Sequence, residues 1–484
     1  MKILKLPYVY YSILFTLILI GVLLRLEYYN DGIWGDEWIG YFFSNPDVPL
    51  NLNYRYFLEF EGSPIINVYF NIFWNYLFGF NYQSQEIGSL IIGFFLLIST
   101  FYFFTEDVQK NIFFLFLFIS NPFLAYYSGE VRFYSTSVFF TFISLIFFFE
   151  LIKKKTFQNI FLFITFSVIA ASINIFSITI YISILVFCFL KKKYNFFIYI
   201  FIIGVLFLIF NFNYITNISN LYTNSGAGSD NFSLNFLLGL YFNIFFGNKF
   251  FGGIVLLTIL YYFFFLNKKI LNTENEKIFL FYLIIFFAYF IPILYGLIKQ
   301  PISYPRHFIY IIPFIIYLFC TYIFQIKKRR LKNTLIILVI FFSIFTNVTQ
   351  NKPYILSKEN PEWVINYLNK SKIKNIYLTV NNAEKISRNI SHIDNEKKDF
   401  LVGDVWYYYS ETSFLHSKYF DQNRFKFINK ASDANKFWTL CNNDLSNGIK
   451  KIPERCKINQ FIKTHNIIKF VNKEHFTLRL YSVK

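Results

Sequence analysis

Charged side chains are scarce in this chain of 484 residues. Lys, Arg, Asp and Glu together make up 15% of it, whereas 55% is hydrophobic and the mean hydropathy is +0.42. Water-soluble globular domains contain about 25% charged residues. The composition therefore excludes an ordinary water-soluble protein and predicts an integral membrane protein.

Cysteine is also rare, with four in the whole chain. Cys188 and Cys320 lie in apolar runs, where we interpret them as small hydrophobic residues. Cys441 and Cys456 lie in the polar C-terminal tail, and their spacing suits neither a zinc ribbon nor a CxxC redox motif. Outside the cytoplasm these two thiols would be able to form a disulfide, and the sequence leaves the disulfide and the free thiols equally open.

Motifs of several large enzyme classes are missing. The five His are scattered without zinc-ligand spacing, and no GxGxxG, Walker A or GxSxG pattern occurs. These absences argue against zinc enzymes, dinucleotide-dependent enzymes, P-loop NTPases and serine hydrolases of the α/β type. No nucleic-acid partner is expected.

Long apolar runs recur from Tyr8 to about Thr346, and each is long enough to cross a hydrocarbon core of roughly 30 Å. About eleven spans are predicted, over residues 8–26, 87–105, 111–127, 133–151, 157–173, 175–190, 195–213, 250–266, 278–298, 307–326 and 333–350. Lys and Arg cluster at every second loop, which predicts a cytoplasmic N-terminus. An odd number of spans then puts the C-terminal tail outside the cytoplasm, in the periplasm or the extracellular space.

The composition changes near residue 351, and the tail from 351 to 484 alternates short apolar runs with polar turns. An amphipathic helix is expected to begin near Asn360, followed by strands over 375–380, "HNIIKFV" and "FTLRLYSV". We expect Trp438 to pack in a core. The predicted fold is a polytopic α-helical membrane domain over 1–350, with interfacial helices in its first outer loop, and a soluble α/β domain over 351–484.

Acidic and basic residues gather, by this topology, at the outer membrane face. A charged side chain at the edge of a membrane is costly unless it is solvated, paired or functional. For a single acid, a solvated loop position is the simpler interpretation. Several motifs placed at one face favour a functional site, and they contribute Asp36, Glu37, Glu61, Glu130, Arg132, Tyr134, Arg306 and His307.

Acids next to guanidinium groups suit a reaction with a phosphate-linked donor. Arg matches phosphate oxygens with a planar fork and stabilises the charge that builds on a leaving phosphate. One carboxylate then acts as the base that removes the acceptor proton. A glycosidase, by contrast, needs a second carboxylic acid to protonate a poor leaving group.

The motifs occur in an order that resembles the C-type membrane glycosyltransferases, in the branch of the protein O-mannosyltransferases and lipid A aminoarabinose transferases. "LRLEYYNDGIWGDEWIG" resembles the first-loop motif of this branch, and "FEGSPIINVYFNIFW" the segment that follows it. "YYSGEVRFYS" is similar to its Glu-x-Arg-x-Tyr turn, and "YPRHFIYIIP" to its late Pro-Arg-Tyr element. The resemblance covers about residues 20 to 350.

The resemblance implies a role for each matching residue. Asp36 would be the catalytic base with Glu37 beside it, and Glu61 and Glu130 would organise the cavity or a divalent metal ion. The donor phosphate would contact the side chains of Arg132, Tyr134, Arg306 and His307. The chain departs from the pattern at Ser63, Glu86 and Asn174, and these departures leave the donor and the metal open.

We therefore predict a hexosyl- or pentosyltransferase that moves a sugar from a polyprenyl-phosphate donor to an acceptor hydroxyl on a lipid, glycan or protein. Its expected place is the inner membrane of the bacterial cell envelope, among membrane lipids, with the reaction at the outer face of that inner membrane. One alternative is a transporter or flippase of lipid-linked substrates, which predicts ionisable residues in the middle of the membrane. Another is a transferase that uses a diphosphate donor.

Overall fold

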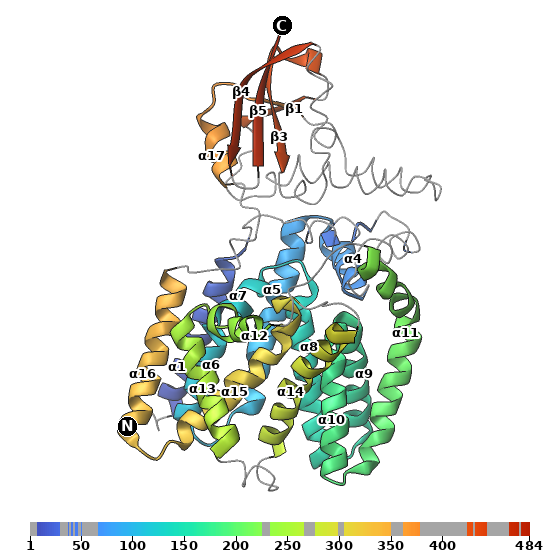
Figure 1. The fold of residues 1–484 in the computed structure, drawn as a ribbon, viewed down its shortest axis with the longest axis vertical. Coiled ribbons are helices and arrows are strands. Elements are labelled where there is room, and N and C mark those ends of the chain that lie inside the picture. The colour runs from blue at the N-terminus through green and yellow to red at the C-terminus, as the bar shows by residue number, and fades with distance from the viewer. Residues whose placement is uncertain are drawn as a thin grey trace. The chain divides into compact units, whose positions relative to one another are not determined.

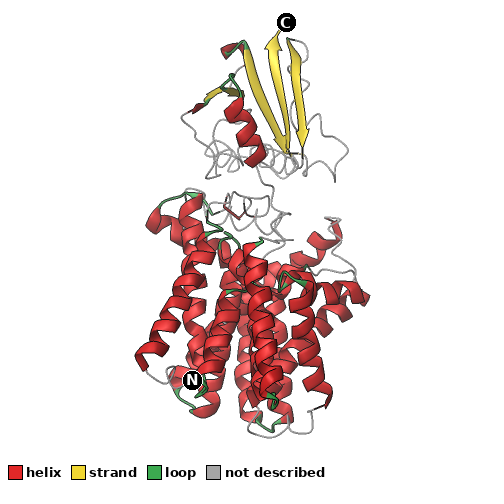
Figure 2. Cartoon of the chain, turned by 90° about the vertical axis from the view of Figure 1, so that its left-hand side faces the viewer, coloured by secondary structure: helices red, strands yellow, loops and turns green. Residues whose placement is uncertain are grey.

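A computed structural model describes residues 7–29, 37, 40–41, 44–46, 50, 66–224, 233–265, 276–298, 304–349, 362–377, 424–428, 431–442, 464–473 and 476–484. These residues belong to two compact units. The first lies within 1–29, 62–70 and 86–354, and the second within 30–61, 71–85 and 355–484. Strands occur in the C-terminal part of the described chain, and the remainder is helical (Figure 2).

Helices make up the N-terminal part of the chain, and many run side by side (Figure 1). The α-helices are α1 (Pro7–Leu26), α4 (Ile66–Phe78), α5 (Tyr82–Ser99), α6 (Val108–Ile119), α7 (Pro122–Ser128), α8 (Phe133–Lys153), α9 (Phe157–Ile173), α10 (Ile178–Leu190), α11 (Phe197–Asn224), α12 (Leu234–Gly239), α13 (Lys249–Phe265), α14 (Glu276–Ile298), α15 (Ile312–Gln325) and α16 (Arg329–Val348). Shorter helical turns are η2 (Thr100–Phe103), η3 (Ile175–Ser177), η4 (Tyr194–Phe196), η5 (Leu240–Ile244) and η8 (Pro305–Ile311).

The predicted spans correspond to these helices. Seven are long and apolar enough to cross a membrane, and the bent pair α6 and α7 would make an eighth. The three shorter apolar helices α9, α10 and α13 overlap three further predicted spans. Each predicted span therefore overlaps an apolar helix, and the prediction of a polytopic α-helical membrane protein is confirmed.

The predicted span over 111–127 is a bent pair of helices and not one straight helix. The chain bends by 55° between α6 and α7. Pro122 has no backbone N–H and its ring clashes with a preceding carbonyl, so it ends one helix and opens the next. The Asn121 side chain caps the new helix by accepting a hydrogen bond from the Leu124 amide at 2.9 Å.

Side-chain hydrogen bonds connect this bend to other helices. Asn121 Nδ2 donates to the carbonyl of Phe245 at 2.8 Å, and Asn347 Nδ2 donates to the carbonyl of Ser120 at 2.9 Å. The hydroxyl of Ser343 also donates to that of Ser120 at 2.7 Å. Because hydrocarbon offers no hydrogen bonds, a broken helix in a membrane requires such partners.

Helix α4 lies within the segment expected to be interfacial. It exposes the rings of Tyr69, Phe73 and Tyr76, and it buries Asn71 and Asn75. An exposed aromatic face on a helix of this length is typical of interfacial helices. Its position in the interface stays a prediction.

The C-terminal residues form a mixed sheet in the order β2-β1-β3-β5-β4. The strands are β1 (Asn375–Tyr377), β2 (Lys426–Ile428), β3 (Lys436–Asn442), β4 (His465–Lys473) and β5 (Phe476–Val483). Pairing is parallel among β1, β2 and β3, and antiparallel where β5 joins β3 and β4. The predicted α/β character is confirmed, while the domain boundary between 350 and 351 stays a prediction.

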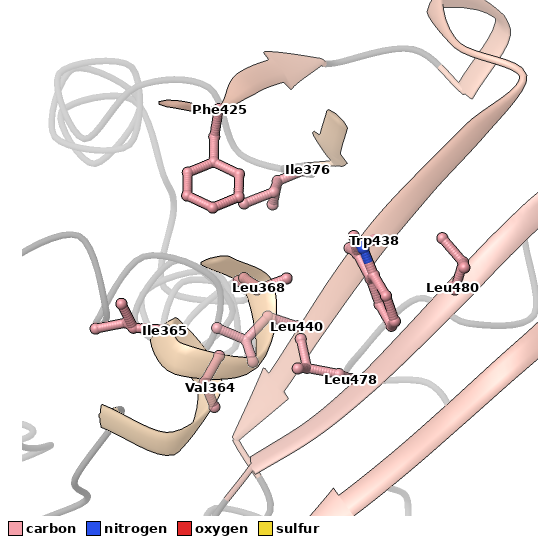
Figure 3. Packing of buried hydrophobic residues seen from close by; sticks show 9 residues of the cluster. All are labelled: Val364, Ile365, Leu368, Ile376, Phe425, Trp438, Leu440, Leu478 and Leu480. Carbon is pink, nitrogen blue, oxygen red and sulfur yellow. The ribbon is translucent and has the colours of Figure 1, made fainter. Parts of the chain in front are cut away.

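Helix α17 (Glu362–Lys370) packs its apolar face on this sheet. Val364, Ile365 and Leu368 are buried in one hydrophobic cluster with Leu440 and Trp438 of β3 (Figure 3). Trp438 is 2% exposed, and its indole N–H donates to the hydroxyl of Ser371 at 3.1 Å. The expectation that Trp438 packs in a core is therefore confirmed.

Candidate active site

A buried turn between α7 and α8 carries two of the predicted site residues. Glu130 is 1% exposed and Arg132 is 7% exposed, and Arg132 forms the N-cap of α8. Gly129 allows this turn to approach the end of α1, because a Cβ there would lie 2.9 Å from the Cβ and 3.1 Å from the carbonyl oxygen of Tyr28. The glycine therefore holds the turn where a side chain would not fit.

Arg306 of η8 reaches the same region from late in the sequence. Its guanidinium carbon lies 5.9 Å from the ring centroid of Tyr134, in the first turn of α8, and 5.1 Å from that of Tyr304. The guanidinium carbon of Arg132 lies 5.5 Å from the ring centroid of Phe133. Cation–π contacts of this kind hold guanidinium groups in place without neutralising their charge.

His307 is buried next to Arg306. Its ring stacks on that of Phe176 at 4.7 Å, and its Nδ1 accepts a hydrogen bond from the Tyr304 amide at 3.3 Å. That hydrogen bond uses the Nδ1 lone pair, so the other ring nitrogen carries the proton. The Asn174 side chain accepts from the Phe176 amide at 3.1 Å, and it thereby fixes the turn against which His307 packs.

Two buried charged residues were not predicted as site residues. Glu86, near the start of α5, is fully buried, and burial together with this carboxylate raises the pKa of Tyr29. Arg25, in the last turn of α1, is 2% exposed, and its Nη1 donates to the Gly21 carbonyl at 3.0 Å. In the sequence, both residues are charged and lie at an end of an apolar run, and this position could have marked them as candidate site residues.

Helix α5 packs closely against the start of α8 and the end of α7. A Cβ on Gly93 would lie 2.8 Å from the hydroxyl oxygen of Ser128 and 3.6 Å from that of Ser135. Ser128 directly precedes the turn that carries Glu130. The buried acid of α5 and the buried turn therefore belong to helices in direct contact.

Glu37 lies in the second unit and is fully buried, so the interpretation of a solvated loop acid is wrong for this residue. Its Oε1 accepts a hydrogen bond from the hydroxyl of Tyr82 at 3.2 Å. The ring of Tyr41 stacks on Phe80 at 4.6 Å and meets the Tyr82 ring edge-on at 5.9 Å. Aromatic packing thus fixes the position of this carboxylate.

The remaining predicted site residues fall elsewhere. Asp36, Glu61 and Cys456 lie outside the described residues, and Cys441 lies in β3. Within the described part of the chain, no group of three or more His, Cys, Asp or Glu is arranged to hold a metal ion. The proposed disulfide and the metal therefore stay predictions.

Known proteins resemble the chain in fold but not detectably in sequence. No protein-family model and no curated protein sequence matches it. The chain is similar to the crystal structure of ArnT from Cupriavidus metallidurans bound to undecaprenyl phosphate. The aligned region covers 96% of this chain and 97% of the ArnT chain, with 8% sequence identity and a TM-score of 0.53. The chain shares the fold of ArnT.

The apo structure of the same ArnT agrees, with a TM-score of 0.54 and 6% identity over the same 96% of this chain and 97% of ArnT. ArnT is a lipid A aminoarabinose transferase with a C-type glycosyltransferase fold. The resemblance that the sequence motifs predicted is therefore confirmed at the level of fold. The two ArnT structures also cover almost the whole of the present chain, including its C-terminal tail.

Proposed function

We propose that this protein is a membrane glycosyltransferase that moves a hexose or pentose from a polyprenyl-phosphate donor to a hydroxyl on a lipid, glycan or protein. The observation that carries the proposal is the meeting of Arg306 with Tyr134, next to the buried turn of Glu130 and Arg132. Guanidinium groups held on aromatic rings near helix ends are suited to a phosphate at the level of lipid headgroups.

The fold supports the same donor class. An ArnT crystal structure contains undecaprenyl phosphate, a polyprenyl phosphate, and the present chain shares that fold. A polyprenyl tail requires hydrocarbon, while its phosphate lies at the membrane surface. Arg132 is the N-cap of α8 and Arg306 lies in η8, which leads into α15, so both arginines lie near the starts of apolar helices, where such a phosphate would be found.

The reaction requires one base and one anion-binding group. The acceptor oxygen attacks the anomeric carbon, the bond from that carbon to the phosphate oxygen breaks, and the phosphate leaves with the electron pair. We assign to Asp36, with Glu37 beside it in the sequence, the role of the base that removes the proton of the acceptor hydroxyl. A single displacement inverts the configuration at the anomeric carbon. Arg132 and Arg306 would stabilise the leaving phosphate, and Glu61 and Glu130 would orient the reactants or hold a divalent metal ion.

The positions of the buried charges favour a transferase over a flippase. In the described helical part of the chain, the buried charged side chains of Arg25, Glu86, Glu130 and Arg132 lie at or near helix ends. A substrate path through the membrane would require ionisable groups at mid-helix. The site would face the periplasm or the extracellular space at the bacterial inner membrane, on the side of the C-terminal tail.

Binding of undecaprenyl phosphate to the full-length protein in nanodiscs tests the donor assignment. Arg306→Gln should weaken binding roughly 10- to 100-fold, because it removes a charged hydrogen-bonding group from the phosphate. Arg330→Gln, an exposed arginine at the start of α16, is the matched control and should leave the affinity unchanged. Equal affinities of both variants and the wild type would contradict the phosphate role of Arg306.

Turnover is tested with a panel of polyprenyl-phosphate-linked hexoses and pentoses. Release of free polyprenyl phosphate that depends on an added hydroxyl acceptor is the expected result. Transport of a labelled lipid across a vesicle membrane, without cleavage of the sugar-phosphate bond, would instead support the flippase.

A further inference from the structure

A second cluster of charges lies at the opposite ends of the helices that form the proposed site. Helix α8 carries Tyr134 in its first turn and Glu150 and Lys153 in its last, and its 21 residues span about 30 Å. Around its last turn gather Tyr102 of η2, Lys110 of α6 and Lys277 of α14. This cluster, the lysine cluster, takes no part in the proposed transfer reaction.

Two ammonium groups lie against one ring at the centre of the lysine cluster. The Nζ of Lys153 is 5.1 Å and the Nζ of Lys277 is 5.2 Å from the ring centroid of Tyr102. The Tyr102 hydroxyl donates to Glu150 at 2.6 Å, and Lys153 donates to the same carboxylate oxygen at 2.7 Å. Both hydrogen bonds reach the same oxygen of Glu150, and the Glu150 carboxylate also attracts the ammonium group of Lys277.

The other two lysines, Lys110 and Lys277, have no carboxylate within ion-pair distance among the described residues. Neither Lys110 nor Lys277 forms an ion pair with a described residue, although the two interact electrostatically with each other. Asp107 lies near Lys110, but its carboxylate caps α6 by accepting from the amides of Gln109 and Lys110 at 3.0 and 3.2 Å. Glu276, next to Lys277, is paired with Lys193 at 2.8 Å.

Beneath these ammonium groups lies a floor of aromatic rings. Lys277 Nζ is 5.4 Å from the ring centroids of both Phe103 and Phe149, and Lys110 Nζ is 5.2 Å from that of Tyr317. Phe103 and Phe149 are buried, and so is Phe281, whose ring centroid lies 5.8 Å from that of Phe103. Like charges held half-buried over an apolar floor repel one another and attract an anion strongly.

The position of the lysine cluster identifies the source of that anion. Lys153 ends one membrane-spanning helix and Lys277 lies in the first turn of another, so both lie where a span meets the headgroup layer. The phosphates of lipids are the fixed negative charges in that layer, and basic pockets between helices bind them. We propose that Lys110, Lys153 and Lys277 bind the phosphodiester headgroup of an anionic membrane lipid, on the face opposite the transferase site.

The experiment compares lipid retention by the full-length protein reconstituted with phosphatidylglycerol or with phosphatidylcholine, using native mass spectrometry. The wild type should retain phosphatidylglycerol preferentially. The double variant Lys110→Gln with Lys277→Gln should lose this preference roughly 10- to 30-fold. The matched control, Lys154→Gln with Lys155→Gln, removes two exposed charges just beyond α8 and should keep the preference.

Three results would overturn the proposal. One is an unchanged preference in the double variant, and another is an equal loss in test and control, which would mean that diffuse charge attracts the lipid. The third is full displacement of phosphatidylglycerol by inorganic phosphate, which would identify a free anion as the ligand. The double variant Lys110→Arg with Lys277→Arg keeps the charge and should keep the preference for phosphatidylglycerol. If the Gln variant does not fold, loss of the preference in this Arg variant would contradict the proposal instead. The outcome is independent of sugar transfer.

Discussion

The guanidinium carbon of Arg306 lies 5.9 Å from the centroid of the Tyr134 ring. The two residues belong to η8 and α8, which are far apart in the sequence, and both residues come from motifs expected at one membrane face. The contact links the late Pro-Arg element to the Glu-x-Arg-x-Tyr turn. It therefore makes the position of the arginine depend on the ring.

Substitution of Tyr134 separates the ring from its hydroxyl. Tyr134→Ala should weaken undecaprenyl phosphate binding about 2- to 5-fold, because a cation–π contact contributes about 0.5–1 kcal/mol to holding Arg306. Tyr134→Phe keeps the ring and should bind like the wild type unless the hydroxyl itself contacts the phosphate. Equilibrium binding in nanodiscs distinguishes the two, and an unaffected Tyr134→Ala would show that Arg306 is held by other contacts.

Gly129 should not tolerate a side chain. A Cβ there would lie 2.9 Å from the Cβ of Tyr28, so Gly129→Ala should lower the free energy of unfolding by about 1–3 kcal/mol and displace the turn with Glu130 and Arg132. Thermal unfolding and undecaprenyl phosphate binding should both report the change. Gly204→Ala in α11 is the control, since nothing lies within 4 Å of its added Cβ and helix propensity favours Ala by about 1 kcal/mol. Equal melting temperatures of the two variants would contradict this prediction.

Asp36→Asn should abolish sugar transfer while undecaprenyl phosphate binding remains. The Asn side-chain amide cannot take the proton from the hydroxyl of the acceptor substrate, and the loss of a general base lowers rates by about 10²- to 10⁴-fold. The control is Asp433→Asn, an exposed acid of the C-terminal tail, which should leave turnover unchanged. Undiminished turnover of purified Asp36→Asn would remove this residue from the role of base.

Cysteine labelling in sealed cells tests the topology. Cys188 and Cys320 are buried and should stay unlabelled, so single cysteines can be introduced after Cys441→Ser and Cys456→Ser. Ser432→Cys in the tail should react with an impermeant maleimide from outside, whereas Lys154→Cys, beyond the end of α8, should react only after lysis. Labelling of both positions from the same side would refute an odd number of spans between Lys154 and Ser432.

Much of the fold follows from the sequence, because the length of an apolar run and the alternation of short strands are local properties. The spans and the strands near His465 and Phe476 were predicted in this way. The break at Pro122 was missed, since an apolar run on both sides concealed a helix stop that proline itself signals.

The site was less accessible to sequence reasoning. Alternating loops share a membrane face, so the topology predicted that Arg306 and Tyr134 lie on one side. Topology does not determine which charged residues become buried. Glu86 was noted as a departure from a motif, and its complete burial depends on helix contacts such as that of Gly93 with Ser128, which no local pattern encodes.

The bend after α6 is tied by side-chain amides to residues far along the chain. Asn121 donates to Phe245, and Asn347 donates to Ser120. A lineage that replaced either Asn with an aliphatic residue would leave a carbonyl in hydrocarbon without a donor, and only a second substitution nearby would restore the balance. Selection should therefore keep a hydrogen-bond donor at positions 121 and 347, and orthologues that lose either one should gain a donor close by.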